Sequence, residues 1–405
     1  MSDAGVALVA GVPVGEACVD LLDLLAGVSD GRSSQGRDHP AAVVLALVAA
    51  ATVAGMTGYT AMAGWVADVP QAVVTDLYLR AGALAVGRPS RSTLWRVCTD
   101  TDARALDTAI AAWTAARRSG RGPAADRQDS GERVSEPLPV DLLRLDGKTV
   151  RGAVDADGSQ VQLLAALAGG TEPGTVAVVI GQAEVTGAKT NEPACARDLL
   201  ETLDIEGSTV TADALHTVKA TAELIHERGG QFVFPVKQNR RALFDALDAL
   251  PWQNTAIADS RTDTGHGRIT RRTIRVLPAP PDLPFPHVDQ VWLIERYVTD
   301  SNGGHLSAAA QLGVASHTPE QAGPAQIAAC NQGHWAVESL HWIRDTCYRE
   351  DHSRVRTRSG PHVLASLRNL AINALRLAGR NDITEATRWA SRNMTRPFTI
   401  LGITS

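Results

Sequence analysis

The feature that most constrains the fold is the order of apolar patterns between residues 141 and 236. Short runs of aliphatic and β-branched residues predict strands, and longer runs with a helical period predict helices. Along the chain they give three strands, a helix, a strand, a helix and a strand, which predicts an α/β domain. The strands are predicted at 141–146, 161–167, 175–185, 208–211 and 231–236, and the helices at 192–203 and 217–228.

Different patterns flank this domain. Apolar residues recur at helical spacing before it, and a polar segment rich in Gly and Pro, typical of a flexible linker, separates the two parts. We therefore expect an all-helical N-terminal domain, a linker and an α/β domain whose order of elements is ribonuclease-H-like. The predicted boundaries are 1–117, 118–139 and 140–405. The last part includes a β-rich insertion at about 250–324, with strands predicted at 272–277 and 290–298, and C-terminal helices over 325–393.

Composition excludes several classes of protein. The five cysteines are scattered and no pair has C-x-x-C spacing, so neither a zinc site nor a disulfide framework is indicated, and reduced thiols in a cytosol are the simpler interpretation. The most apolar run, 41–56, is shorter than the ~18 residues of a membrane span and predicts a buried core helix instead.

Charge is unevenly distributed. The net charge of −5 argues mildly against a partner that is a nucleic acid. However, residues 331–405 contain 11 Arg, no Lys and 6 acidic residues, so this segment is basic and the rest of the chain is acidic. Such a segment can hold a phosphate backbone locally, or form a solvated helical surface.

Two aspartates stand where predicted strands end. Asp146 closes the string LLRLD, and Asp213 closes VTAD. Alone, each has an ordinary explanation: Asp146 before Gly147 fits a turn, and Asp213 fits a helix N-cap. Together, at the ends of two strands that can be neighbours in one sheet, they indicate a site.

A third acid, Glu338, lies in a predicted helix. His334, Glu338, His341 and Asp345 follow at i, i+4, i+7 and i+11, so they share one helix face. An amphipathic helix with a polar outer face explains this pattern as well. A mononuclear zinc hydrolase using His334, Glu338 and His341 is a weaker alternative, because the spacing is not H-E-x-x-H and no fourth ligand is evident.

Carboxylates on separate elements suit divalent metal ions. Mg²⁺ prefers oxygen ligands and keeps several waters. Two ions roughly 3.5–4 Å apart can activate a nucleophile and stabilise a leaving oxygen. Carboxylates on separate elements, such as Asp146, Asp213 and Glu338, can bridge and flank such a metal pair.

Several strings together resemble the DDE transposases of bacterial insertion sequences, in particular the H-repeat-associated, ISAs-type group. GRDHPAAVVLALVAAATVAGMTGYTAMAGWV resembles that group's N-terminal associated domain, and SLRNLAINALRLAG its tail. LDGKTVRG, KTNEPACARDLLETLDIEGSTVTADALHT and GHWAVESLHWIRDTCYRED resemble the three catalytic blocks. The resemblance implies that Asp146, Asp213 and Glu338 are the DDE residues, the catalytic ligands of two Mg²⁺ ions for which Mn²⁺ can substitute.

The resemblance also implies a function. It implies a Mg²⁺-dependent transposase of ribonuclease-H-like fold that cleaves DNA at the element ends and transfers strands to target DNA. The expected partners are DNA and a second copy of the chain on paired ends. No membrane partner is expected, and the expected location is the cytoplasm, at the nucleoid when DNA is bound.

Basic and aromatic residues near these blocks are candidates for DNA contacts. Basic side chains can hold phosphates, whereas His and Trp can stack on or wedge beside an extruded base. Surface charge and core packing are the alternative explanations. The candidates are Lys148, Arg151, Lys189, Lys237, Arg240, His334, Trp335, His341 and Trp342.

The chain departs from the family pattern at Gln162, Gln332 and Ser339, where His, Arg and Asn are usual. None of these changes removes a proposed metal ligand, but an Arg at 332 could have gripped a phosphate. Two alternatives therefore accompany the transposase hypothesis. One is a hydrolytic nuclease without strand transfer, and the other is an inactive or domesticated DNA-binding protein.

Overall fold

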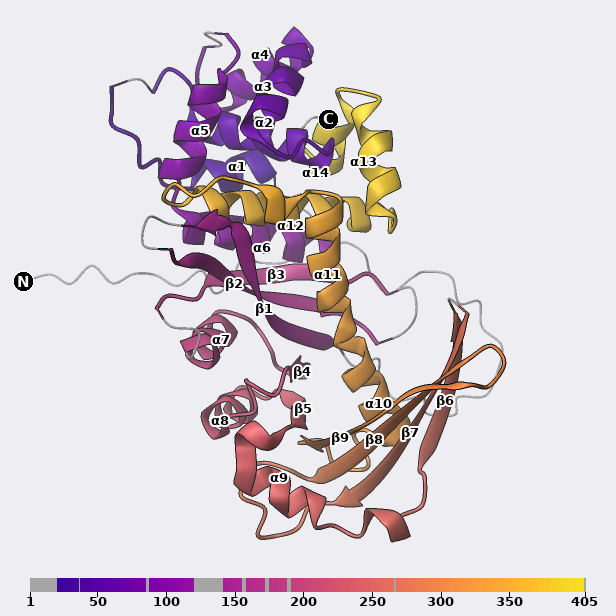
Figure 1. The fold of residues 1–405 in the computed structure, drawn as a ribbon. Coiled ribbons are helices and arrows are strands. Elements are labelled where there is room, and N and C mark those ends of the chain that lie inside the picture. The colour runs from indigo at the N-terminus through magenta and orange to yellow at the C-terminus, as the bar shows by residue number, and fades with distance from the viewer. Residues whose placement is uncertain are drawn as a thin grey trace, which may run out of the picture.

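The structure is a computed structural model that describes residues 20–35, 37–84, 87–119, 141–154, 158–171, 175–187, 191–265 and 267–403. A nine-stranded sheet runs through this part of the chain in the order β3-β2-β1-β4-β5-β9-β8-β7-β6. Helices cover one end of the sheet on both faces, and strands β6 to β9 extend away from them (Figure 1). From residue 120 on, the predicted linker lies outside the described residues.

The first five strands confirm the predicted order. Strand β1 pairs antiparallel with β2 and parallel with β4, while β3 and β5 lie outside these. Helices α7 and α8 pack on one face of the sheet and, with aliphatic side chains of the strands, enclose a hydrophobic core. This mixed α/β arrangement fits a ribonuclease-H-like fold. The bounds are β1 (Leu142–Val154), β2 (Gln160–Gly169), β3 (Val178–Glu184), α7 (Glu192–Glu201), β4 (Thr209–Ala212), α8 (Lys219–Glu227) and β5 (Gln231–Val236).

The predicted β-rich insertion is an antiparallel meander that continues the same sheet. Its last strand pairs with β5, so the meander is joined to the first five strands by main-chain hydrogen bonds. The sequence predicted two of these strands, at 272–277 and 290–298, and missed the first and last. The bounds are α9 (Arg241–Asp248), β6 (Asp259–Gly265), β7 (Arg268–Pro278), β8 (Gln290–Asp300) and β9 (His305–Ala315).

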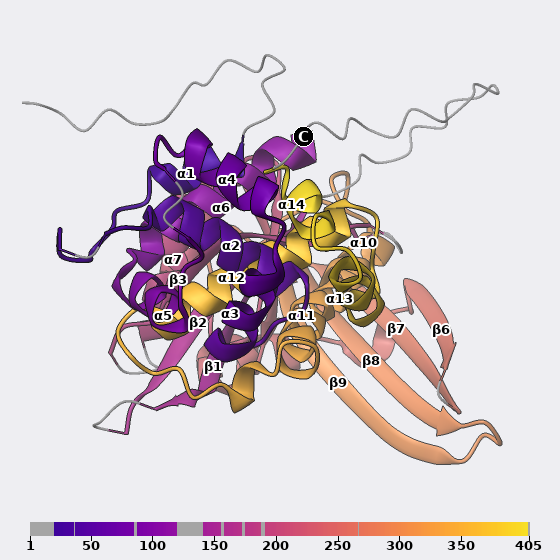
Figure 2. The ribbon, with the colours of Figure 1, turned by 90° about the horizontal axis from the view of Figure 1, so that it is seen from above.

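A helical layer covers the other face of β1 to β3. The apolar run predicted as a core helix is α2, whose residues from Ala42 to Val53 are all buried among the surrounding helices. N-terminal and C-terminal helices share one hydrophobic core, which Leu167 and Val179 of the sheet also enter. Figure 2 shows these helices stacked above β1 to β3. They are α1 (Leu21–Ala26), α2 (Ala41–Val53), α3 (Tyr59–Asp68), α4 (Gln71–Arg80), α5 (Arg91–Asp100), α6 (Ala103–Ser119), α12 (Gly360–Leu377), α13 (Ile383–Ser391) and α14 (Arg396–Leu401).

Two helices in line, α10 (Pro324–Gly333) and α11 (Trp335–Thr346), connect the end of β9 to the helical layer. They cross β1 at a close approach, because a Cβ on Gly333 would lie 2.7 Å from a methyl carbon of Leu142. The buried guanidinium of Arg144 donates from Nε to the Gly333 carbonyl at 2.6 Å. Glycine at 333 therefore lets the helix pair dock on β1.

The structure bears on the predictions about membrane spans and about the cysteines. None of their helices combines the length and apolar character needed to cross a bilayer. Cys98, Cys195, Cys330 and Cys347 are free thiols.

Candidate functional site

Asp146 and Asp213 occupy equivalent positions on adjacent strands. In the parallel pairing of β1 with β4, Leu145 lies opposite Ala212, and the pairing stops there. Asp146 and Asp213 are therefore the next residues on the two strands, at the same edge of the sheet. The prediction that the first strand ends at Asp146 was wrong, because β1 continues to Val154 and stays paired with β2 beyond Asp146.

Asp213 begins a turn rather than capping a helix. Its Oδ1 accepts a hydrogen bond from the Leu215 amide at 2.8 Å, and its side chain is half exposed, at 50%. Helix α8 begins only at Lys219, with Val218 as its N-cap. The carboxylate thus stays accessible to solvent beside the buried end of β4.

The electrostatics of Asp146 show a crowded acidic site. Burial, followed by the negative charge of Asp213, raises the pKa of Asp146 to about 7. Glu192 and Glu338 add smaller contributions in the same direction, while a hydrogen bond from the Gly147 amide opposes them. A cation at this edge of the sheet would relieve the repulsion, so oxygen ligands and charge both fit a hard divalent metal.

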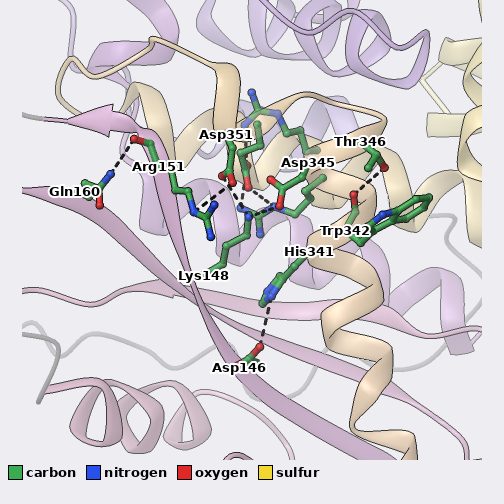
Figure 3. A network of polar contacts seen from close by, with 12 residues as sticks. Asp146, Lys148, Arg151, Gln160, His341, Trp342, Asp345, Thr346 and Asp351 are labelled. Atoms are coloured by element: carbon green, nitrogen blue, oxygen red, sulfur yellow. Dashed lines mark hydrogen bonds and ion pairs between the residues drawn. The ribbon is translucent and has the colours of Figure 1, made fainter. Parts of the chain in front are cut away.

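Glu338 lies on α11, the helix that contacts Asp146 through His341. It lies exposed in the first turn of the helix, and one turn later the Nδ1 atom of His341 is 3.4 Å from Oδ2 of Asp146 (Figure 3). Burial lowers the pKa of His341 to about 3, so the ring is neutral near pH 7. No cluster of three or more His, Cys, Asp or Glu side chains poised to hold an ion occurs among the described residues. Glu338 thus shares a helix face with His341, which contacts Asp146, but its carboxylate is not gathered with those of Asp146 and Asp213.

The start of α11 is tied to the strand that precedes Asp213. Nδ1 of His334 lies 3.2 Å from the Thr211 hydroxyl. Burial lowers the pKa of His334 to about 4, which keeps this ring neutral as well. His334 and His341 therefore contact β4 and β1, respectively, and neither lies with Glu338 in a zinc-like cluster.

A buried acid that the sequence did not single out lies beside these residues. Glu192, at the first position of α7, is only 4% exposed. Its Oε1 is 3.1 Å from Nε2 of His216, and its Oε2 accepts a hydrogen bond from the Gln162 amide. The sequence contained one signal. Glu192 stands at the start of a predicted helix in the same catalytic block as Asp213, but acids are also common at exposed helix starts.

Sequence comparisons place these residues in a family. The family described as "Transposase DDE domain" matches residues 158–374, more than half of the 405-residue chain. The chain belongs to the DDE transposase family. A second family, described as "DDE_Tnp_1-associated", matches residues 22–114. The first match contains Asp213 and Glu338, whereas Asp146 precedes it.

Individual relatives agree with this assignment. The transposase is 24% identical over 365 residues to "Putative transposase YncI" of Escherichia coli O157:H7, which covers 88% of this chain and 87% of the relative. It is 28% identical over 250 residues to "H repeat-associated putative transposase YhhI" of Escherichia coli strain K12, covering 58% and 64%. A solved piggyBac transposase synaptic complex with hairpin DNA aligns with 89% of this chain at 11% identity and a TM-score of 0.38. The family matches and the two sequence relatives confirm the resemblance to H-repeat-associated DDE transposases, and the chain is a DNA transposase.

The structure distinguishes the candidate phosphate contacts by their exposure. Lys148 is only 9% exposed, and its ammonium lies 2.7 Å from Asp345 and 3.4 Å from Asp351 (Figure 3). The side chain of Arg151 is 78% exposed and only loosely paired with Asp351, at 3.6 Å. Lys148 is therefore committed to an internal ion pair in the transposase, whereas Arg151 points to solvent.

The remaining basic candidates also differ. Lys237 is exposed, whereas Arg240 is half-buried and donates to the Leu215 carbonyl, in the turn that follows Asp213. Arg240 thus supports the turn that follows Asp213 by a hydrogen bond to its backbone. Lys189 lies outside the described residues.

The two tryptophans of α11 do not pack in the core. Trp335 is 60% exposed and Trp342 is 62% exposed, although buried Trp is the commoner case in this chain. They are seven residues apart on α11, close to the side that carries Glu338. Large aromatic rings exposed beside an acidic site are typical of a binding surface.

Trp335 also lines a cavity of the described structure. This cavity of about 1230 Å³ lies between the meander, α9 and α10. Its wall is apolar with a set of basic side chains, and its lining includes Lys237, Arg261, Arg272, Arg296, Gln332 and Trp335. The cavity therefore opens beside the start of α11, within reach of the helix that carries Glu338.

Proposed function

We propose that Asp146, Asp213 and Glu338 are the catalytic metal ligands of this transposase, and that they bind Mg²⁺, as a pair of ions for which Mn²⁺ can substitute. The main support is the register of β1 and β4, which brings the first two carboxylates to one edge of the sheet. The charge of Glu338 already acts on Asp146. The finer assignment of the domain as ribonuclease-H-like rests on the same strand order.

In this proposal the side chains divide the work. Bound metal would supply Lewis-acid activation of the attacking water or 3′-hydroxyl and would stabilise the leaving 3′-oxygen. Asp146 and Asp213 would hold it at this edge of the sheet, and Glu338 would complete the ligand set from α11. Neutral His341 contacts Asp146 without competing as a cation. The transposase would cut one strand at the element end, and the freed 3′-hydroxyl would then attack target DNA.

We further propose where DNA lies. Exposed Arg151 and Lys237 would contact phosphates on either side of the acids, and Trp335 and Trp342 would stack on bases exposed near the cut. The helical layer would recognise element ends or join two copies of the chain on paired ends.

The deciding experiment is a cleavage and joining assay on labelled DNA carrying the sequences that flank the gene. Intact transposase is compared with Glu338→Ala and with Glu385→Ala, an exposed glutamate in the first turn of α13. We expect cleavage and joining by the intact protein and by Glu385→Ala, with Mg²⁺ or Mn²⁺. Loss of several kcal/mol of charge stabilisation should slow Glu338→Ala by at least about 1,000-fold.

Other outcomes would replace the proposal. Cleavage without joined product would indicate a hydrolytic nuclease. DNA binding without cleavage by any of the three proteins, with both metals tried, would indicate an inactive or domesticated DNA-binding protein. Equal cleavage by Glu338→Ala and the intact protein would remove Glu338 from the site.

A further inference from the structure

The buried carboxylate of Glu192 joins three segments of the site. His216, which contacts Oε1, follows Asp213 by three residues, and its Nε2 lies 3.9 Å from the Asp213 carboxylate. Gln162, which donates to Oε2, lies on β2 opposite Thr149 of β1. One carboxylate thus links the neighbouring strand β2 with the turn that presents Asp213.

Glu192 also lies against the backbone of the third segment. A Cβ on Gly147 would be 2.5 Å from Oε1 and 2.8 Å from Cδ of Glu192, distances that no real Cβ tolerates. The glycine immediately after Asp146 therefore makes room for this carboxylate. Glu192 occupies the space between the peptide that follows Asp146 and the turn that follows Asp213.

This placement is energetically expensive. Burial of a carboxylate in a protein costs several kcal/mol unless hydrogen bonds compensate for the lost water. The neighbours described here are an amide and an imidazole, and His216 is fully buried with no hydrogen-bond partner at Nδ1 among the described residues. The charge of Glu192 also adds to the repulsion at Asp146. A chain selected for stability alone would place an apolar residue here, so the cost indicates a functional role.

We propose that Glu192, acting through His216 and the Gly147 backbone, is a positioning residue that fixes the separation of Asp146 and Asp213. The proposal rests on the assignment of these two aspartates as metal ligands. In this proposal Glu192 would hold the two aspartates in place and would itself touch neither substrate nor metal. Groups that hold metal ligands in place from behind typically contribute 10-fold to 100-fold to metal affinity.

The test measures Mn²⁺ binding to the full chain without DNA, by calorimetry and by electron paramagnetic resonance. Glu192→Gln keeps the volume and removes the charge, and His216→Gln breaks the link from the other side. Asp107→Asn is a matched control, because Asp107 of α6 is a mostly buried carboxylate held 2.6 Å from the buried imidazole of His362 on α12. Circular dichroism establishes that each variant is folded at the temperature of measurement.

We expect Glu192→Gln and His216→Gln each to weaken Mn²⁺ binding by about 10-fold to 100-fold, and Asp107→Asn to bind as the intact protein does. In cleavage assays the Mn²⁺ concentration for half-maximal rate should rise for both variants, while the rate at saturating Mn²⁺ recovers. A general loss of stability would not produce this separation.

Three results would overturn the inference. Mn²⁺ affinity unchanged in both variants would show that Glu192 does not set the site. A loss as complete as that of Asp146→Asn would make Glu192 a direct ligand instead. Equal weakening by Asp107→Asn would show an effect of stability alone. If Asp146→Asn does not reduce Mn²⁺ binding, the proposed function itself fails, and this outcome is distinct from the other three.

Discussion

Two of the proposed ligands are carried by the sheet and the third by a helix, and these supports differ in kind. Strands β1 and β4, which carry Asp146 and precede Asp213, each lie between two paired strands, so main-chain hydrogen bonds hold them from both sides. Glu338 lies exposed on α11, which reaches the sheet and the helical layer through side-chain contacts.

The difference teaches where the site can be altered selectively. A main-chain ladder survives most side-chain changes, because its hydrogen bonds do not depend on residue type. Each side-chain link of α11 can be removed by one substitution. Asp146 and Asp213 should therefore form a preset half of the site, whose geometry resists single substitutions. The position of Glu338 should form the adjustable half, which a single substitution can change.

The largest expected effect comes from breaking the anchor of α11. Glu350 is fully buried and pairs with Arg344 of α11 at 2.9 Å and with Arg368 of α12 at 2.8 Å. Although burial alone would raise it, these guanidiniums hold the pKa of Glu350 at about 2. Glu350→Ala leaves two buried cations unpaired and should lower the free energy of unfolding by about 3–5 kcal/mol, measured by urea denaturation.

The control is an ion pair at the surface. Glu385→Ala removes the partner of Arg380, a pair of partly exposed side chains at 3.0 Å, and should cost under about 1 kcal/mol. Similar losses for Glu350→Ala and Glu385→Ala would show that α11 does not depend on its buried anchor.

The second effect acts through pH on the contact between the helical layer and strand β3. Burial lowers the pKa of His362, but hydrogen bonds to Asp107 and Glu184 raise it to about 9. Because the folded pKa is above the unfolded value of about 6.5, the stabilisation is complete below pH 6.5 and is lost as pH rises through about 9. A shift of this size corresponds to at most about 3 kcal/mol.

Urea unfolding of the intact transposase and of His362→Gln at pH 6.5, 8 and 9.5 measures the contribution of His362 to the free energy of unfolding. The difference in stability between the two proteins should shrink as pH rises, since only the intact protein loses the imidazolium. A difference that is constant or grows with pH would show that His362 is not charged in the folded protein.

Much of this organisation could be predicted from sequence, and the exceptions have physical reasons. The order of β1 to β5 followed from apolar periodicity, and the proximity of Asp146 and Asp213 followed from parallel neighbouring strands. Strands β6 and β9 were missed because DSRTDTG is polar and the first half of HLSAAAQLGVA is exposed and Ala-rich. Their pairing partners, not their own propensities, make them strands.

The site shows the same limit. Asp146-Gly147-Lys148 is typical of a turn, but pairing with β2 keeps it extended. The burial of Lys148 depends on Asp345, which is 197 residues away in sequence. Glu192 contacts the Asp146 segment only through the fold. Such contacts between distant segments leave no local pattern, so the sequence identified the acids and missed what supports them.

The third effect concerns the exposed face of α11. Trp335→Ala and Trp342→Ala should change the free energy of unfolding by less than about 0.5 kcal/mol, because both rings are mostly exposed. Each should weaken binding of element-end DNA by about 1–3 kcal/mol if the ring stacks on a base. Trp95→Ala, a 41% exposed tryptophan on α5, is the matched control for fluorescence-anisotropy titrations. Unchanged DNA affinity in both α11 variants would exclude base stacking.

The smallest expected effect distinguishes two roles of Lys148. If its ion pair with Asp345 positions α11, Lys148→Met and Asp345→Asn should both slow cleavage, by about tenfold, since the contacts of Arg144 and Arg344 remain. If Lys148 instead binds a DNA phosphate, Lys148→Met should reduce the salt dependence of DNA binding by about one unit of slope. Asp345→Asn would then release the ammonium and leave DNA affinity equal or higher. Equal slowing by both variants with an unchanged salt slope identifies the ion pair as the support of Glu338. Opposite effects of the two variants on DNA affinity identify Lys148 as a phosphate contact, and the position of Glu338 then depends on other contacts of α11.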